Sequence, residues 1–246
     1  MNSKAARFSF LLFQLLVFIL GIGICIFGIV RTDDTEAIYR YICAVARIII
    51  LLLISATYFK MSGSTFSQGS SFMMLCIFCL SFAELRVISD FTLLTGISIM
   101  PPRAIVRTQL LSQFLLHICL IGYAVYYQNS EYTTNSRFLL LGVGATVFLS
   151  LVIPSSQTLP GMWTHTAPLL VLSVLAVVTL FTHFILTTSE PTTAGAIRHV
   201  SIMLMVVGNF FGIVFSSMTF IIVGTSLFVV GGILAVTVTL RNSVIL

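Results

Sequence analysis

The sequence predicts an all-α protein, a polytopic bundle of transmembrane helices with short loops and no soluble domain, in which residues 1–246 form a single domain. Of the 246 residues, 58% are hydrophobic and only 8% are charged, whereas soluble domains carry about 25% charged residues. The mean hydropathy is +1.12, and the apolar residues form several runs near the length of about 20 that a spanning helix needs. This composition excludes a soluble globule, a disordered chain and a nucleic-acid-binding protein, and it predicts the lipid bilayer as the surroundings.

The first apolar run begins after two basic residues. Lys4 and Arg7 precede a run that extends from Phe8 to Val30. A secretory signal has an apolar region of about 7–15 residues followed by a small-residue cleavage site, and neither feature is present here. The segment is therefore expected to stay attached as the first span.

The last apolar run is too long for one span. No charge occurs in the 41 residues from Val200 to Leu240, and a single helix of this length would extend about 60 Å against a hydrocarbon core of about 30 Å. We expect it to fold back near Ser216, Ser217 and Thr219, whose hydroxyl groups can bond freed backbone groups. With charges, prolines and polar residues marking the other ends, the expected spans are approximately 8–30, 41–59, 71–94, 109–127, 138–154, 167–187, 199–217 and 221–240.

Eight spans are expected, and seven is the alternative if 138–154 lies only at the membrane interface. Lys and Arg in short loops favour the cytoplasmic side. With eight spans and the N-terminus inside, six basic loop residues lie on the cytoplasmic side and four lie outside. With seven spans, a cytoplasmic majority of six to four is obtained only if the N-terminus lies outside. We therefore expect an integral protein of the plasma (inner) membrane with both termini cytoplasmic, which rests on the apolar length of 138–154. The six are Lys4, Arg7, Lys60, Arg137, Arg198 and Arg241, and the four are Arg31, Arg40, Arg103 and Arg107.

Three ionisable residues interrupt the third expected span. Glu84, Arg86 and Asp90 lie in an otherwise apolar stretch, and each would cost about 2.5–3.5 kcal/mol at the centre of an isolated helix. Such residues normally face a bundle interior or a water-filled cavity. Arg86 and Asp90 are four residues apart and can pair on one helix face, whereas Glu84 lies about 200° around the helix from Arg86 and needs another partner.

Depth in the membrane indicates where that partner lies. Counting 1.5 Å per residue from the expected outer helix ends places Arg47 at about 9 Å, Glu84 at about 10–15 Å and His117 at about 12 Å. We therefore predict an intramembrane polar cluster of Arg47, Glu84, Arg86, Asp90 and His117. Its functional interpretation is a proton relay, a solute site or an anion pocket. Its structural interpretation is an ion-pair network that fixes helix register, or a third span that surfaces early and places Arg86 and Asp90 at the interface.

No pattern in the sequence indicates a cofactor or a metal. The five cysteines fall in or at the edge of apolar runs and are interpreted as small apolar residues; the pair Cys76 and Cys79 has no second pair placed to exchange electrons with it. The four histidines show no HExxH or paired pattern. There is no GxSxG, Walker A or GxGxxG motif, so we expect no cofactor and no metal and identify no catalytic residue.

Small residues recur at every fourth position of the seventh expected span. Gly208, Gly212 and Ser216 line one face, and such faces allow close approach of helix backbones in lipid. Gly231 continues the pattern in the eighth span, and Asn209 lies in a position to hydrogen-bond across helices. We predict a helix-packing face at Gly208, Gly212 and Ser216, whose partner helix belongs either to this chain or to another.

The ionisable residues are divided unevenly along the chain. Residues 1–127 hold nine Lys or Arg and five Asp or Glu, and residues 128–246 hold three and two, unlike transporters built from two comparable repeats. We therefore favour a non-enzymatic multi-pass membrane protein, either a subunit of a membrane complex or a small sensor or scaffold unit, whose partners are other membrane-protein subunits or a second copy. The alternative is a small-solute or proton translocator that uses the polar cluster. A third option is a membrane-embedded enzyme acting on a lipid or quinone.

Overall fold

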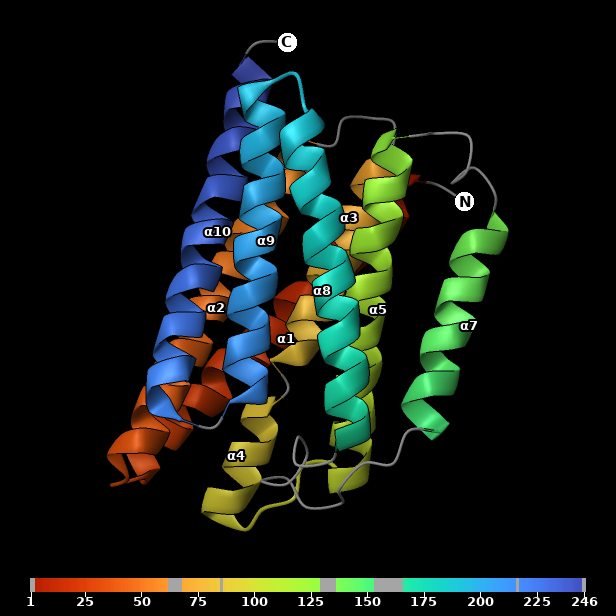
Figure 1. Cartoon of the computed structure of the whole chain (residues 1–246). Coiled ribbons are helices and arrows are strands. Elements are labelled where there is room, and N and C mark those ends of the chain that lie inside the picture. The colour runs from red at the N-terminus through yellow and green to blue at the C-terminus, as the bar shows by residue number, and fades with distance from the viewer. Residues whose placement is uncertain are drawn as a thin grey trace.

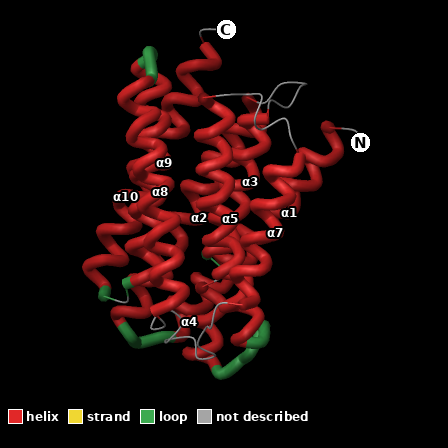
Figure 2. Tube along the Cα trace, turned by 45° about the vertical axis from the view of Figure 1, so that its right-hand side comes forward, coloured by secondary structure: helices red, strands yellow, loops and turns green. Residues whose placement is uncertain are grey.

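The structure is a computed structural model that describes residues 3–61, 68–84, 86–128, 136–152, 166–215 and 217–244. These residues form helices and no strand (Figures 1 and 2). Seven stretches within them are long and apolar enough to cross a membrane, so the prediction of an all-α, multi-pass membrane protein is confirmed. The helices are α1 (Ser3–Arg31), α2 (Thr35–Met61), α3 (Gln68–Ala83), α4 (Arg86–Thr95), α5 (Pro102–Gln128), α7 (Ser136–Val152), α8 (Thr166–Ser189), α9 (Thr193–Val214) and α10 (Met218–Val244).

The helices pack in two layers. In Figure 1, α10, α9, α8, α5 and α7 stand side by side across one layer, and each contacts the next. Behind them, α2 packs on α10, α3 packs on α5 and α1 packs on α2. The main apolar core lies between the layers and includes Leu51, Leu116 and Phe228.

Local sequence determines where three of the helices begin. Oδ1 of Asp34 accepts a 3.0 Å hydrogen bond from the backbone N of Glu36 at the start of α2, and Pro102 occupies the first position of α5, where proline is favoured. The hydroxyl of Thr192 accepts a 3.1 Å bond from the backbone N of Gly195 and caps α9. These helices begin before the predicted boundaries at 41, 109 and 199, because charged and polar residues mark the edge of an apolar run rather than the end of the helix.

The predicted third span, 71–94, is not one continuous helix, because α3 ends and α4 begins on either side of Glu84. There, the backbone N of Val87 donates to the carbonyl of Glu84 at 3.1 Å, a three-residue turn in place of the four-residue helical bond. One turn earlier, the hydroxyl of Ser81 donates to the carbonyl of Ile77 at 2.8 Å, a contact that bends helices. The break lies within the length of the bundle rather than at its end (Figure 1).

The predicted last run folds back as expected. α9 ends at Val214 and α10 begins at Met218, so the reversal lies near the predicted position; Ser217 precedes α10, Thr219 is its second residue, and Ser216 lies outside the described residues. The two helices pack against each other along their length. As a result, α1 begins and α10 ends toward the same end of the bundle (Figures 1 and 2).

The direction of α7, which corresponds to the predicted span 138–154, affects the number of crossings. Its apolar part within the described residues, Leu141–Val152, is shorter than the seven long spans. However, α5 and α8 run in the same direction along the bundle, and α7, which lies between them in the sequence, runs in the opposite direction on the other side of α5 (Figure 1). If α5 and α8 both cross the membrane, the chain must return across it between them. Eight crossings therefore remain our prediction, with α7 as the returning helix.

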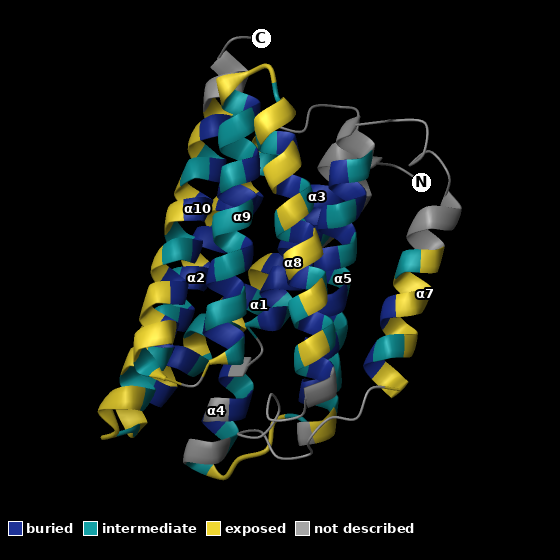
Figure 3. Cartoon of the chain, in the orientation of Figure 1, coloured by how far each residue is buried: buried dark blue, intermediate teal, exposed yellow. Residues whose placement is uncertain are grey.

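A second stripe of small residues joins α7 to the bundle. Gly142, Thr146 and Ser150 recur at every fourth position, and the side chains of Thr146 and Ser150 are buried. A Cβ at Gly142 would lie 2.7 Å from Cγ2 of Ile118 on α5, and Nη1 of Arg107 donates to the carbonyl of Ser150. Most of the other described residues of α7 are exposed (Figure 3). This stripe was not among the packing faces predicted from sequence, although its spacing is the same as that of Gly208 and its neighbours.

Candidate functional site

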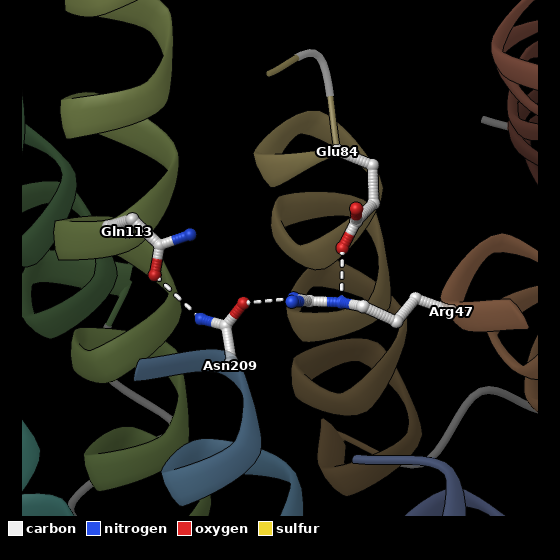
Figure 4. Close-up of polar contacts among 4 residues, drawn as sticks. All are labelled: Arg47, Glu84, Gln113 and Asn209. Carbon is white, nitrogen blue, oxygen red and sulfur yellow. Dashed lines mark hydrogen bonds and ion pairs between the residues drawn. The ribbon is translucent and has the colours of Figure 1, made fainter. Parts of the chain in front are cut away.

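Arg47 lies at the centre of the bundle and is bound by groups from other parts of the chain (Figure 4). Its side chain extends from α2, and the residue is 4% exposed. Nε of Arg47 lies 2.7 Å from Oε1 of Glu84, at the break between α3 and α4. Nη2 donates a 2.7 Å hydrogen bond to Oδ1 of Asn209 on α9. One guanidinium group therefore holds three segments together.

Asn209 extends these contacts to α5. Its Nδ2 donates a 2.7 Å hydrogen bond to Oε1 of Gln113 (Figure 4). Asn209 and Gln113 are 2% and 1% exposed, so their contact is closed to solvent. Because an amide both accepts and donates, Asn209 connects the charged Arg47 to the neutral Gln113. We call Arg47, Glu84, Asn209 and Gln113 the Arg47 network.

Two further residues shape the space around the guanidinium group. Cζ of Arg47 lies 4.7 Å from the ring centroid of Phe228 on α10, within the range of a cation–π interaction. A Cβ at Gly212 of α9 would meet Nη1 of Arg47, so glycine leaves the room that the guanidinium group occupies. The Arg47 network is thus enclosed by α2, α5, α9, α10 and the α3–α4 break.

The structure places His117 against α8, and within the described residues it forms no hydrogen bond or ion pair with Arg47 or Glu84 of the predicted polar cluster. Nδ1 of His117 lies 3.0 Å from the hydroxyl of Thr179 on α8. His117 follows Gln113 by four residues, which corresponds to about 6 Å along the helix axis. The expected depth in the membrane is accurate only to a few residues, so it does not distinguish Gln113 from His117 as the residue of α5 that joins Arg47. The residue of α5 that joins the Arg47 network is Gln113.

Three predicted residues lie outside what the structure describes. Arg86 and Asp90 belong to the backbone of α4, but their side chains are not among the described ones. Ser216, between α9 and α10, is also not described. The predicted pairing of Arg86 with Asp90, and the place of Ser216 in the packing face, stay predictions.

Gly208 and Gly212 have different neighbours. A Cβ at Gly208 would lie 2.6 Å from the backbone N of Phe228, and a Cβ at Gly224 would lie 2.8 Å from the carbonyl oxygen of Gly208. The backbones of α9 and α10 are therefore in direct contact at this level, and the partner helix of Gly208 belongs to the same chain. Gly212, one turn later, also lies against α10, because a Cβ at Gly224 would be 2.9 Å from its backbone N, but a Cβ at Gly212 itself would meet Arg47.

No family model, curated protein or solved structure was found that matches this chain. Its function must therefore be inferred from its own residues.

Gln113 is the member of the Arg47 network that the sequence analysis missed. A signal was present, because Gln109, Gln113 and His117 recur at every fourth position of an otherwise apolar helix. All three residues are buried. Nε2 of Gln109 and Nε2 of Gln113 have no hydrogen-bond partner among the described residues. A polar stripe of this kind on a membrane helix faces the interior of the bundle.

Two histidines that appeared isolated in the sequence are in contact. His183 and His199 lie on α8 and α9, nearly equidistant from the turn that joins these helices, and their Nδ1 atoms are 3.1 Å apart. For this hydrogen bond, one Nδ1 must carry the proton and the other must accept it. The ring of Tyr123 lies beside them, 6.3 Å from the ring of His183. Within the described residues, no group of three or more metal-ligating side chains is assembled.

The chemistry available to the Arg47 network follows from its bonding. Arg47 and Glu84 compensate each other's charge, and Asn209 binds the guanidinium group from the other side. Cys76, Cys79 and Cys119 belong to the main apolar core and form no disulfide. This arrangement of the Arg47 network holds helices together and compensates charge.

Proposed function

We propose that this chain is a non-enzymatic subunit of a membrane complex, a helical unit that acts through a partner protein. The observation that carries this proposal is the enclosure of the Arg47 network. Arg47, Asn209 and Gln113 are buried between helices and bonded to one another. A translocator needs a water-accessible path from such groups to both membrane surfaces, whereas a charge held by internal partners serves to fix the positions of helices.

The second half of the chain offers the surface that we assign to the partner. Along α8, Leu170, Val174, Val177, Phe181 and Phe184 are exposed at helical spacing (Figure 3). α8 contains no Lys, Arg, Asp or Glu, so this face suits the apolar helices of another subunit. The described connections between α1 and α2 and between α8 and α9 are only three residues long.

A second function is supported by the break between α3 and α4. Discontinuous spans with polar groups at the break are typical of secondary transporters. Glu84 lies at this break, and its side chain is 11% exposed, more than that of Arg47 at 5%. In a translocator, Glu84 would take up and release the proton or bind the solute.

One pair of measurements separates the two functions. We expect a photoreactive residue in place of Phe181, which is 64% exposed on α8, to cross-link a second membrane polypeptide in native membranes. The same residue in place of Ile19, which is 63% exposed on α1, is the matched control and should cross-link lipid only. We also expect proteoliposomes of the purified chain to hold a proton gradient.

Two results would contradict the subunit proposal. One is lipid adducts alone at Phe181 in native membranes. The other is a proton flux that is lost in Glu84→Gln and retained in Glu36→Gln, a matched change at an exposed carboxylate on α2. That flux would establish the translocator.

Both termini are proposed to be cytoplasmic. The support is the six-to-four count of basic residues in the loops and the common direction of α5 and α8. Reporter domains fused after Gly63 and after Arg241 should both report a cytoplasmic location. An external location at Arg241 combined with a cytoplasmic one at Gly63 would rule out eight crossings.

A further inference from the structure

A cavity of about 260 Å³ lies between α1, α2 and the α3–α4 break. Its wall is almost entirely apolar and includes Val17 and Ile24 of α1, Ile48 of α2 and Val87 of α4. An apolar cavity of about 150 Å³ holds a benzene molecule. The space here therefore admits a larger hydrocarbon body, such as a substituted aromatic ring.

Two polar residues, Ser81 and Glu84, are part of this wall. The hydroxyl of Ser81 is already engaged, because it donates to the carbonyl of Ile77 and accepts a 3.1 Å bond from Nε2 of Gln14. Glu84 uses Oε1 to bind Arg47. Its other carboxylate oxygen has no hydrogen-bond partner among the described residues, so Glu84 is the group that can accept a bond from a molecule in the cavity.

The net charge of the Arg47–Glu84 pair, which is zero, indicates which kind of molecule the cavity can bind. Arg47 and Glu84 together are neutral, and both are largely buried. An ammonium or carboxylate ligand would add an uncompensated charge to this low-dielectric site, whereas a neutral O–H group adds none. We propose that the cavity binds a neutral lipophilic alcohol or phenol, whose hydroxyl donates to Glu84 and whose hydrocarbon body fills the apolar space. This proposal is independent of the subunit proposal, because it concerns the first half of the chain and is tested on the purified protein.

Four probes with the same ten carbon atoms test the proposal on the full chain in phosphatidylcholine nanodiscs. They are p-cymene, 4-isopropylbenzyl alcohol, 4-isopropylbenzylamine and 4-isopropylbenzoate, which differ in one polar group. We expect the alcohol to raise the thermal midpoint, followed by circular dichroism at 222 nm, by about 3 °C or more above the effect of the other three. Equal shifts with p-cymene and the alcohol would overturn the proposal, as would a larger shift with the amine or the benzoate. No shift with any probe would overturn it too, because a membrane lipid would then occupy the cavity.

A pair of identical substitutions locates the binding. Val17→Phe places a ring in the cavity, whereas Val177→Phe adds the same ring on the exposed face of α8. The shift caused by the alcohol should be lost in Val17→Phe and kept in Val177→Phe. A shift that survives in Val17→Phe would show that the alcohol acts elsewhere or through the lipid, and the proposal would be wrong. The comparison of the four probes needs no variant, so it decides the outcome even if Val17→Phe does not fold.

Discussion

Replacing Glu84 with Gln, or Arg47 with Met, is expected to destabilise the folded bundle by about 3–5 kcal/mol, because either change leaves one buried charge without its partner. The Nε–Oε1 distance is 2.7 Å and both side chains are largely buried, so the remaining group would lose its main source of charge compensation. The double variant should recover much of the loss, since the penalty comes from the remaining charge more than from the missing attraction. Recovery should stay incomplete, because Oδ1 of Asn209 also loses its donor when Arg47 is replaced.

A double-mutant cycle of unfolding free energies in detergent measures this coupling. The matched control is the exposed pair Arg40 and Glu36 on α2, whose atoms lie 3.8 Å apart. Arg40→Met and Glu36→Gln should each change stability by less than about 1 kcal/mol, as is usual for exposed pairs. Additive losses at Arg47 and Glu84 would show that the two residues are not energetic partners.

Replacing Gly208 with Leu is expected to prevent the close packing of α9 on α10. Even the first carbon atom of the new side chain would lie 2.6 Å from the backbone N of Phe228 and against the carbonyl oxygen of Gly224. Both contacts are with backbone atoms, so no side-chain movement can relieve them. We expect a loss above about 3 kcal/mol, beyond the usual range for an overfilled core, seen as a lower thermal midpoint or a loss of folded protein in detergent.

The control for this prediction is Gly144→Leu on α7. A Cβ at Gly144 has no neighbour within 4 Å, so the same change in an apolar helix should leave the midpoint unaltered. Gly212→Leu should also be destabilising, but by displacing the guanidinium group of Arg47 rather than by separating the helices. If Gly208→Leu behaves like Gly144→Leu, the proposed packing of α9 on α10 is incorrect.

The parts of the fold that follow from apolar length were predictable from sequence. The hydrocarbon thickness sets the number of residues in a span, so the fold class and the reversal between α9 and α10 could be predicted from residue counts alone. Depth also brought Arg47 and Glu84 to a common level, and the structure places them in contact. Depth says nothing about rotation around a helix axis, however, and so it did not distinguish His117 from Gln113.

The remaining features depend on contacts between distant segments. The break at Glu84 accompanies the contact of its carboxylate with Arg47, and no proline or glycine marks it in the local sequence. His183 and His199 are in contact because α8 and α9 are joined by a short turn, and no residue close to either histidine in the sequence indicates this contact. Polar residues at equal distances from the turn of a predicted helical hairpin are expected to lie close together, and this rule predicts the contact between His183 and His199.

The long separation between Arg47 and its partners has a consequence for how the chain is made. Asn209 follows Arg47 by 162 residues, and Phe228 comes later still, so neither has been synthesised when α2 leaves the ribosome. During translation, which proceeds from the N-terminus, Glu84 is the first of the described partners to emerge. In a nascent chain that ends before α9, Glu84 is therefore the only one of these three partners that can bind Arg47. The contacts of Arg47 are therefore complete only after α9 and α10, the last two described helices of the chain, have been synthesised and have packed into the bundle.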